Sequence, residues 1–193
     1  MGRIKIPQLE LEEALRLHKM WLDGTGGKKF YFFGNDLTGA DLSNADLRYA
    51  EMYSCNLSGA DLSNANLSGA ELSGTATDLS GAKLCGSVCI ETDFAWANFN
   101  GADLSNANLS GANLNPISME NANMRNANLS GAVLCWAKLQ SADLTGVIVD
   151  NTTDLYRADM SGAKYDIDTL RMAILENAVI SDGTIYTGKN AEL

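Results

Sequence analysis

The twelve residues GADLSNANLSGA occupy positions 59–70 and occur again, letter for letter, at positions 101–112. Within each copy a leucine returns every fifth residue, with alanine two places before it and Asp or Asn between them. An α-helix repeats about every 3.6 residues and a strand every two, so neither element holds this spacing over a long stretch. The period of five therefore indicates a coil of short extended pieces joined by turns.

The same period runs through most of the chain. A large side chain recurs every five positions from Phe32 to Leu72, from Leu79 to Val149 and from Leu155 to Tyr165, which makes 27 units within residues 30–165. The frame slips by two residues near 73–78 and by one near 150–154. The first slip lies between the two copies of the phrase, so their offset is 42 residues, where eight units alone would give about 40.

Each unit has the composition of a minimal strand followed by a corner. Side chains two positions apart point to the same side of an extended chain, so the alanine and the leucine should face a core. The Asp or Asn between them should then face water. The remaining two positions are mostly Ser, Gly and Asn, which favour turns and tolerate positive φ.

The run ADLSNANLSGAEL and its neighbours resemble the pentapeptide-repeat family, whose pattern is A(D/N)LXX. That resemblance implies an all-β fold, a right-handed quadrilateral β-helix in which four units make one square coil. The 27 units would form nearly seven coils. We expect three parts, namely an N-terminal capping helix and linker (residues 1–29), the β-helix (30–165) and a C-terminal cap (166–193).

Both ends of the β-helix carry sequences that predict caps. Residues 8–23 place one apolar face at helical spacing ahead of the breaker at 24–27, and they resemble the leader that many bacterial pentapeptide-repeat proteins carry. The face consists of Leu11, Ala14, Leu15, His18, Trp21 and Leu22. At the other end, Asp168 or Thr169 is predicted as the N-cap of a short helix, and a hairpin is predicted around Asp182 and Gly183.

The composition restricts the possible partners. The net charge is -10 and the isoelectric point is near 4.4, which argues against direct nucleic acid binding and favours a basic protein partner. No signal peptide and no apolar run of membrane-spanning length are present, so we expect no membrane partner and a cytoplasmic location. The expected oligomeric state is a monomer or an end-to-end homodimer.

The sequence offers no catalytic, cofactor or metal site. His18 is the only histidine and lies on the apolar side of the predicted helix, where we interpret it as a packing residue. Cys55 and Cys89 occupy inward positions, whereas Cys85 and Cys135 should face outward on opposite faces. Neither a disulfide nor a shared metal site is therefore expected.

Two outward features are candidate binding sites. Trp96 and Trp136 each follow a central apolar residue by two places and are 40 residues apart, so they should occupy one corner, two coils apart, with Pro116 between them. This group is a hypothetical protein-binding stripe, because aromatic residues dominate interface energetics. The alternative is that each Trp simply packs flat on its neighbours.

The second feature is a concentration of acids in the N-terminal half of the repeats. We interpret it as an acidic face, although a solvated surface is an alternative account. The face would consist of Asp36, Asp41, Asp46, Glu51, Asp61, Glu71, Asp78, Asp93 and Asp103.

These features predict a non-catalytic interaction scaffold with an unidentified protein partner. The family resemblance implies an alternative function, that of an acidic DNA mimic that binds the bacterial type II topoisomerase DNA gyrase, as quinolone-resistance members do.

Overall fold

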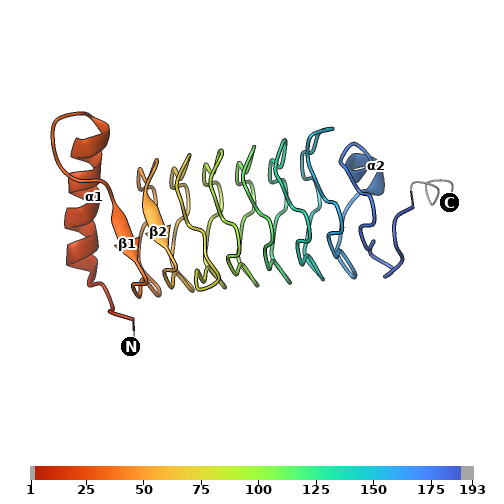
Figure 1. The fold of residues 1–193 in the computed structure, drawn as a ribbon, viewed down its shortest axis with the longest axis horizontal. Helices are drawn as coiled ribbons and strands as arrows, with labels where there is room; N and C mark the ends of the chain where they lie inside the picture. Colours follow the sequence, from red (N-terminus) through yellow and green to blue (C-terminus); the bar gives the residue numbers. More distant parts are fainter. Residues whose placement is uncertain (1–2, 188–193) are drawn as a thin grey trace.

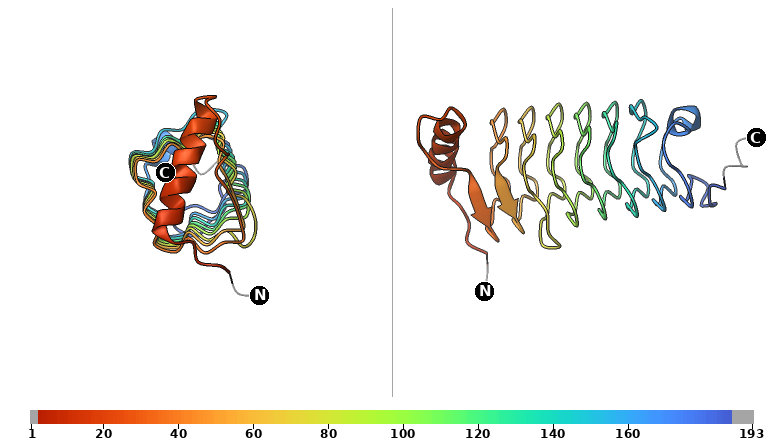
Figure 2. Two further views of the ribbon diagram at one scale, coloured as in Figure 1. Left: turned by 90° about the vertical axis from the view of Figure 1, so that its left-hand side faces the viewer. Right: turned by 45° about the horizontal axis from the view of Figure 1, so that its top comes forward.

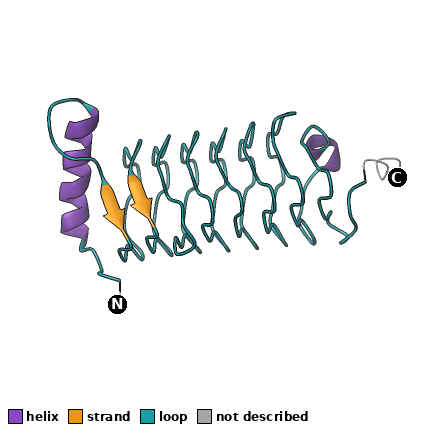
Figure 3. Ribbon diagram, viewed as in Figure 1, coloured by secondary structure: helices purple, strands orange, loops and turns teal. Residues whose placement is uncertain are grey.

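The computed structural model describes residues 3–187, which form a rod of stacked coils (Figure 1). The elements are α1 (Gln8–Leu22), β1 (Tyr31–Phe33), β2 (Glu51–Tyr53) and α2 (Ile167–Leu170). Turns and single paired residues make up most of the coils, as the teal segments of Figure 3 show. A five-residue unit leaves room for only a very short extended piece before the chain turns again.

The coils stack through parallel backbone pairing. β1 and β2 pair with Tyr31 opposite Glu51 and Phe33 opposite Tyr53. Farther along, single residues pair with the residue 20 positions later, as Asp41 does with Asp61. Four units therefore complete one coil, and the rod has four sides (Figure 2, left). Its centre is filled by buried apolar side chains.

The outward residue of each unit belongs to one of four faces. Face 1 carries Asp36, Asn56, Asp78, Asn98, Ser118, Lys138, Asp159 and Val179. Face 2 carries Asp41, Asp61, Lys83, Asp103, Asn123, Asp143 and Lys164. Face 3 carries Asp46, Asn66, Val88, Asn108, Asn128 and Ile148. Face 4 carries Tyr31, Glu51, Glu71, Asp93, Asn113, Val133, Asp154 and Ile174.

The pairing also locates the two slips. Asn56 pairs with Asp78, and the extra residues form a turn in which the Thr77 N–H donates to the carbonyl of Gly74 at 2.9 Å. Gly74 has a φ of 123°, a conformation that side-chain-bearing residues rarely adopt. Val133 pairs with Asp154, which marks the one-residue insertion. Both insertions lie at corners, so the interior columns continue past them.

The core is a stack of layers made by the alanine and the central residue of each unit. Leu62 and Leu104, the central residues of the repeated phrase, are both fully buried. The Phe94 and Phe99 rings meet edge to face with centroids 5.0 Å apart. Cys55 and Cys89 are buried at the inward positions that the sequence predicts, whereas Cys85 and Cys135 are half-buried, and all four are free thiols.

Helix α1 is present over nearly the predicted range and lies across the first coil (Figures 1 and 2). It buries Leu11 and His18 completely. The Phe30 N–H donates to Nδ1 of His18 at 3.0 Å, and Nε2 of His18 lies 3.1 Å from the carbonyl oxygen of Arg48. The single histidine thus links α1 to two points of the first coil.

The parallel pairing continues beyond Tyr165. Asp154 pairs with Ile174 and Asp159 with Val179, while Leu170 and Leu175 are buried. The five-residue frame therefore extends into the segment expected as a separate cap. The division between residues 165 and 166 stays a prediction.

The predicted N-cap of the C-terminal helix is wrong. Asp166, and neither Asp168 nor Thr169, caps α2, because the helix begins early enough for the Asp166 carboxylate to accept the Asp168 N–H at 2.9 Å.

The predicted hairpin around Asp182 and Gly183 is present. Val179 pairs with Ile185 in antiparallel fashion, and the Ile180 N–H donates to the Thr184 carbonyl at 2.8 Å. Residues 188–193 of the predicted cap lie outside the described residues.

Candidate protein-binding surface

Trp96, Pro116 and Trp136 lie at one corner of the rod, between faces 4 and 1. Trp96 and Trp136 follow the buried residues Phe94 and Leu134 by two positions. The Trp96 N–H donates to the carbonyl of Pro116 in the next coil at 2.7 Å. The three residues thus occupy consecutive coils, as their spacing predicts. We call them the tryptophan column.

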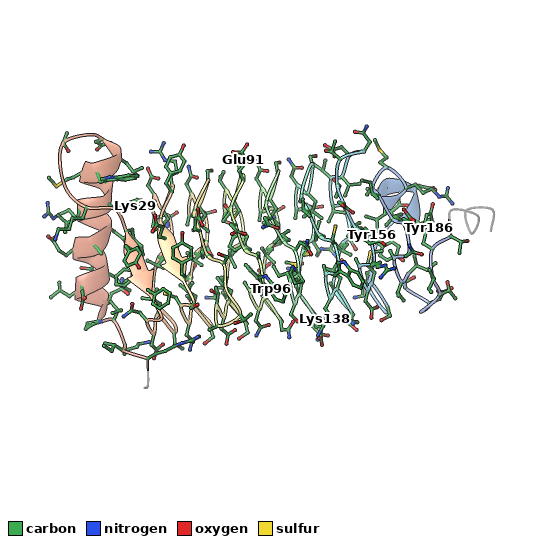
Figure 4. All side chains as sticks on the ribbon, viewed as in Figure 1. Lys29, Glu91, Trp96, Lys138, Tyr156 and Tyr186 are labelled. Atoms are coloured by element: carbon green, nitrogen blue, oxygen red, sulfur yellow. The ribbon has the colours of Figure 1, made fainter. Side chains whose placement is uncertain are left out.

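The tryptophan column borders a shallow groove. The exposed fractions are 59% for Trp96 and 52% for Trp136, whereas the neighbouring Ala97 and Ile117 are buried. The groove has a volume of about 240 Å³. Its polar side on face 1 is formed by Asn98, Ser118 and Lys138. In Figure 4, Trp96, Lys138 and Tyr156 follow one another along the rod towards α2.

Both tryptophans stand at backbone positions that disfavour them. Trp96 has a φ of 67° and Trp136 a φ of 61°. Most equivalent corners hold Gly or Asn, for example Asn44 and Asn106. A left-handed conformation costs an ordinary side chain roughly 1–2 kcal/mol, which Gly avoids and Asn partly offsets. The fold by itself therefore does not account for tryptophan at these two corners.

A cationic side chain adjoins one end of the column. The Arg157 guanidinium lies 4.6 Å from the ring centroid of Trp136 and 5.3 Å from that of Tyr156. The Trp136 and Tyr156 rings meet edge to face at 6.2 Å. Trp136 therefore does pack on neighbours, whereas Trp96 makes no ring contact within residues 3–187.

Arg157 and Lys138 also belong to this surface, although the sequence pattern predicts only Trp96, Pro116 and Trp136 there. The one-residue slip near 150–154 conceals that Arg157 follows Trp136 in the same corner. Lys138 follows Trp136 by two residues, but it has the spacing of any outward residue, so nothing in its position distinguishes it. Counting positions across the slip could have placed Arg157.

The acids do not form a single face. Face 1 holds Asp36 and Asp78, face 2 holds Asp41, Asp61 and Asp103, face 3 holds Asp46, and face 4 holds Glu51, Glu71 and Asp93. The interpretation of one acidic face is therefore wrong. The chain turns to the next side at every unit, so acids five residues apart point in different directions. They surround the N-terminal half of the rod.

Many of these carboxylates are engaged in local structure. The aspartates accept the backbone N–H two residues later, as Asp36 does from Thr38 and Asp61 does from Ser63, each at 3.0 Å. The Thr38 hydroxyl and N–H hold the pKa of Asp36 below its ordinary value. Ion pairs join Asp46 to Arg48 and Glu51 to Lys29. An aspartate before the central leucine thus stabilises the turn that follows it.

The titratable side chains of His18 and Cys89 are fully buried. Burial lowers the pKa of His18, and both of its ring nitrogens are engaged with backbone groups. Burial raises the pKa of the Cys89 thiol to about 12. No group of three or more His, Cys, Asp or Glu side chains within residues 3–187 is arranged to hold a metal ion. Over the same range, no helix has the length and hydropathy needed to cross a membrane.

Pairing at 20-residue intervals defines a four-sided β-helix built from five-residue units. The sequence model of the family described as Pentapeptide repeats matches eight copies over residues 36–74, 77–115 and 117–162, which is more than half of the chain. The chain therefore belongs to the pentapeptide repeat family, whose members fold as right-handed β-helices. The unmatched residues 75–76 and 116 fall at the two-residue insertion and at Pro116 of the tryptophan column.

Several solved structures are similar to this chain. QnrB1, a plasmid-mediated fluoroquinolone resistance protein, is 22% identical with a TM-score of 0.41, covering 78% of this chain and 72% of that one. HetL from Nostoc sp. strain PCC 7120, a protein involved in heterocyst differentiation regulation, is 27% identical with a TM-score of 0.29, covering 87% and 97%. Rfr23 from Cyanothece 51142 is 24% identical with a TM-score of 0.39, covering 78% and 97%. No curated protein sequence matches this chain significantly.

Proposed function

We propose that this protein is a non-catalytic interaction scaffold and that the tryptophan column binds a protein partner. One observation carries the proposal: two exposed tryptophans occupy aligned corners where the backbone favours Gly or Asn. Strained positions that persist in a fold often serve function. Tryptophan is also among the side chains that contribute most to protein interfaces.

The architecture suits such a role. The stacked coils hold the tryptophan column on a rigid, repetitive support, and we propose that α1 and the hairpin after Val179 act as its end caps. Uncovered ends of a repeat protein expose apolar layers and unpaired backbone groups. Capping would favour a single rod that presents its side to a partner.

The test is a capture experiment with the full chain as bait. A Trp96→Asn/Trp136→Asn double variant should lose the proteins that the wild type retains. The rod should stay folded in this variant, because Asn suits the left-handed corner. Tyr49→Asn is the matched control, since Tyr49 is 54% exposed and has a φ of 61° at a different corner. Glu91, in the same corner column as Tyr49, lies far from Trp96 across the width of the rod in Figure 4.

The expected result is loss of a partner by the double variant and retention by Tyr49→Asn. An unchanged set of partners for the double variant would contradict the proposal. A circular dichroism spectrum of each variant controls for loss of fold.

The acids support the alternative function less well than the tryptophan column supports the scaffold function. In that alternative, the protein mimics DNA and binds gyrase. The acids are distributed over four faces and are engaged in turns and ion pairs. The identity to QnrB1 is too low to carry that protein's role to this chain.

A further inference from the structure

We infer that the partner segment bound by the tryptophan column is a proline-rich stretch in the polyproline II conformation with an acidic residue at one end. This inference rests on the proposed function and specifies the chemistry of the partner. It follows from the spacing of the column, its free hydrogen-bond donors and its charges.

The spacing along the rod matches the pitch of a polyproline II helix. Trp96 and Trp136 are separated by two coils, with Pro116 between them. At the usual strand spacing, two coils correspond to about 9.6 Å, and one turn of polyproline II is about 9.3 Å. A segment lying parallel to the rod would therefore present equivalent residues to both indole rings.

The groove also has donors to offer such a segment. The indole N–H groups of Trp96 and Trp136 donate to no acceptor within residues 3–187. A polyproline II helix has no internal hydrogen bonds, so its carbonyls are free to accept. Aromatic-lined grooves that bind proline-rich segments combine flat apolar contacts with donors of this kind. Buried Ala97 and Ile117 keep the base of the groove apolar.

The positive charges beside the groove indicate that one end of the bound segment is acidic. Lys138 lines the groove and Arg157 stacks on Trp136. Within the described residues neither side chain forms an ion pair, although the chain as a whole carries a net charge of -10. The nearby Asp159 carboxylate accepts from Gln140 at 2.7 Å and from the Ser161 hydroxyl at 2.7 Å. Two free cations at one end of the groove complement a carboxylate on the ligand.

The test uses a synthetic peptide with an uninterrupted proline run and an aspartate pair at one end, titrated into the full chain by calorimetry. We expect saturable binding that becomes at least about tenfold weaker in Trp96→Asn and in Trp136→Asn. Tyr49→Asn should bind as the wild type does. A peptide of equal charge in which Gly and Ser replace the prolines should not bind. Lys138→Glu should weaken binding of the aspartate peptide more than binding of a proline peptide that ends in lysines.

Absence of saturable binding by the proline peptide, or equal binding by the Gly/Ser peptide, would overturn the inference. If the peptide fails while capture of a cellular partner still requires both tryptophans, the inference falls and the proposed function stands. If capture does not depend on the tryptophans either, both fall.

Discussion

At the scale of single residues, the second turn position of each unit is the most selective place in the sequence. It adopts a left-handed backbone, and Gly or Asn fills it in most units. The larger side chains that also stand there are Tyr49, Glu91, Trp96, Trp136 and Arg157. Only a few residue types suit this conformation, and the two exposed tryptophans depart from the pattern at the same corner, two coils apart.

Replacing Trp96 with Asn should leave the free energy of unfolding unchanged or raise it by up to about 1 kcal/mol, because the left-handed corner is relieved. Trp96 makes no ring contact in the described part of the chain that would offset this gain. Denaturant unfolding followed by circular dichroism measures the change. A loss of more than about 1 kcal/mol would mean that the Trp96 ring stabilises its coil.

The Asp150 carboxylate makes the stability of the protein depend on pH. Hydrogen bonds from the Thr152 hydroxyl and N–H lower the pKa of Asp150 from 3.8 to about 2. A carboxyl whose pKa is depressed by folding stabilises the protein above its unfolded pKa, and this contribution disappears as the pH falls through the folded pKa. We expect wild-type stability to decline between about pH 4 and pH 2.

Asp150→Asn keeps a side-chain acceptor but does not titrate, so part of this acid sensitivity should disappear in the variant. The pH dependence of the unfolding midpoint, compared between the two proteins, measures the effect. Identical slopes over the acid range would argue against this role of Asp150.

At the scale of elements, α1 depends on a neutral His18. The imidazole is fully buried, accepts the Phe30 N–H and stacks on Trp21 at 5.5 Å. Burial lowers the pKa of His18, the hydrogen bond to the Arg48 carbonyl and the charge of Asp46 raise it, and the charges of Lys29 and Arg48 lower it further. Protonation would place a second donor opposite the Phe30 N–H and weaken the attachment of the helix.

The stability that His18 contributes depends on pH. Because folding depresses the pKa of His18 from 6.5, its contribution is complete above pH 6.5 and is lost as the pH falls through the folded value. We expect α1 to loosen as the pH falls below 6.5. Trp21 emission reports this when Trp96→Asn and Trp136→Asn leave Trp21 as the only remaining tryptophan.

His18→Gln in the same background should remove the change in Trp21 emission that begins as the pH falls below about 6.5. If the transition persists without His18, another group controls the attachment of α1.

At the scale of the whole molecule, the sequence predicts the fold well because one period carries both the core and the corners. The alanine and the leucine of each unit face inward, and the repeat of five indicates the coil. The neighbours of each surface side chain are harder to predict, because every five-residue unit faces a different side of the rod from the unit before it. That rotation distributes Asp36 and Asp41 onto different faces and brings Arg157 beside Trp136.

The C-terminal boundary illustrates a second limit. Leu170 and Leu175 keep the five-residue frame, but Ile174 and Val179 stand where Asp or Asn marks most earlier units. The core residues keep the repeat, but the outward residues no longer do, so the sequence does not clearly predict that the coil continues. For the candidate site, the spacing predicts the tryptophan column directly, whereas placing Arg157 in the same corner requires the one-residue slip to be counted.

The proposed scaffold role predicts a negative result with DNA gyrase. The acids surround the rod, and many already accept hydrogen bonds or pair with Lys and Arg. In a supercoiling assay, excess protein should neither inhibit gyrase nor protect it from a quinolone. Inhibition that weakens on charge reversal of the acids in residues 36–103 would favour DNA mimicry.

Site-specific photocrosslinking in cells tests most directly whether the tryptophan column binds a protein partner. A crosslinking residue at Lys138 lies beside the tryptophan column, and the same residue at Lys83 occupies the equivalent unit position on face 2. Binding of a partner by the tryptophan column predicts a discrete protein adduct at position 138 that disappears when Trp96 and Trp136 are replaced with Asn, and none at position 83. The same adducts at both positions, or an adduct at 138 that persists without the tryptophans, would contradict it.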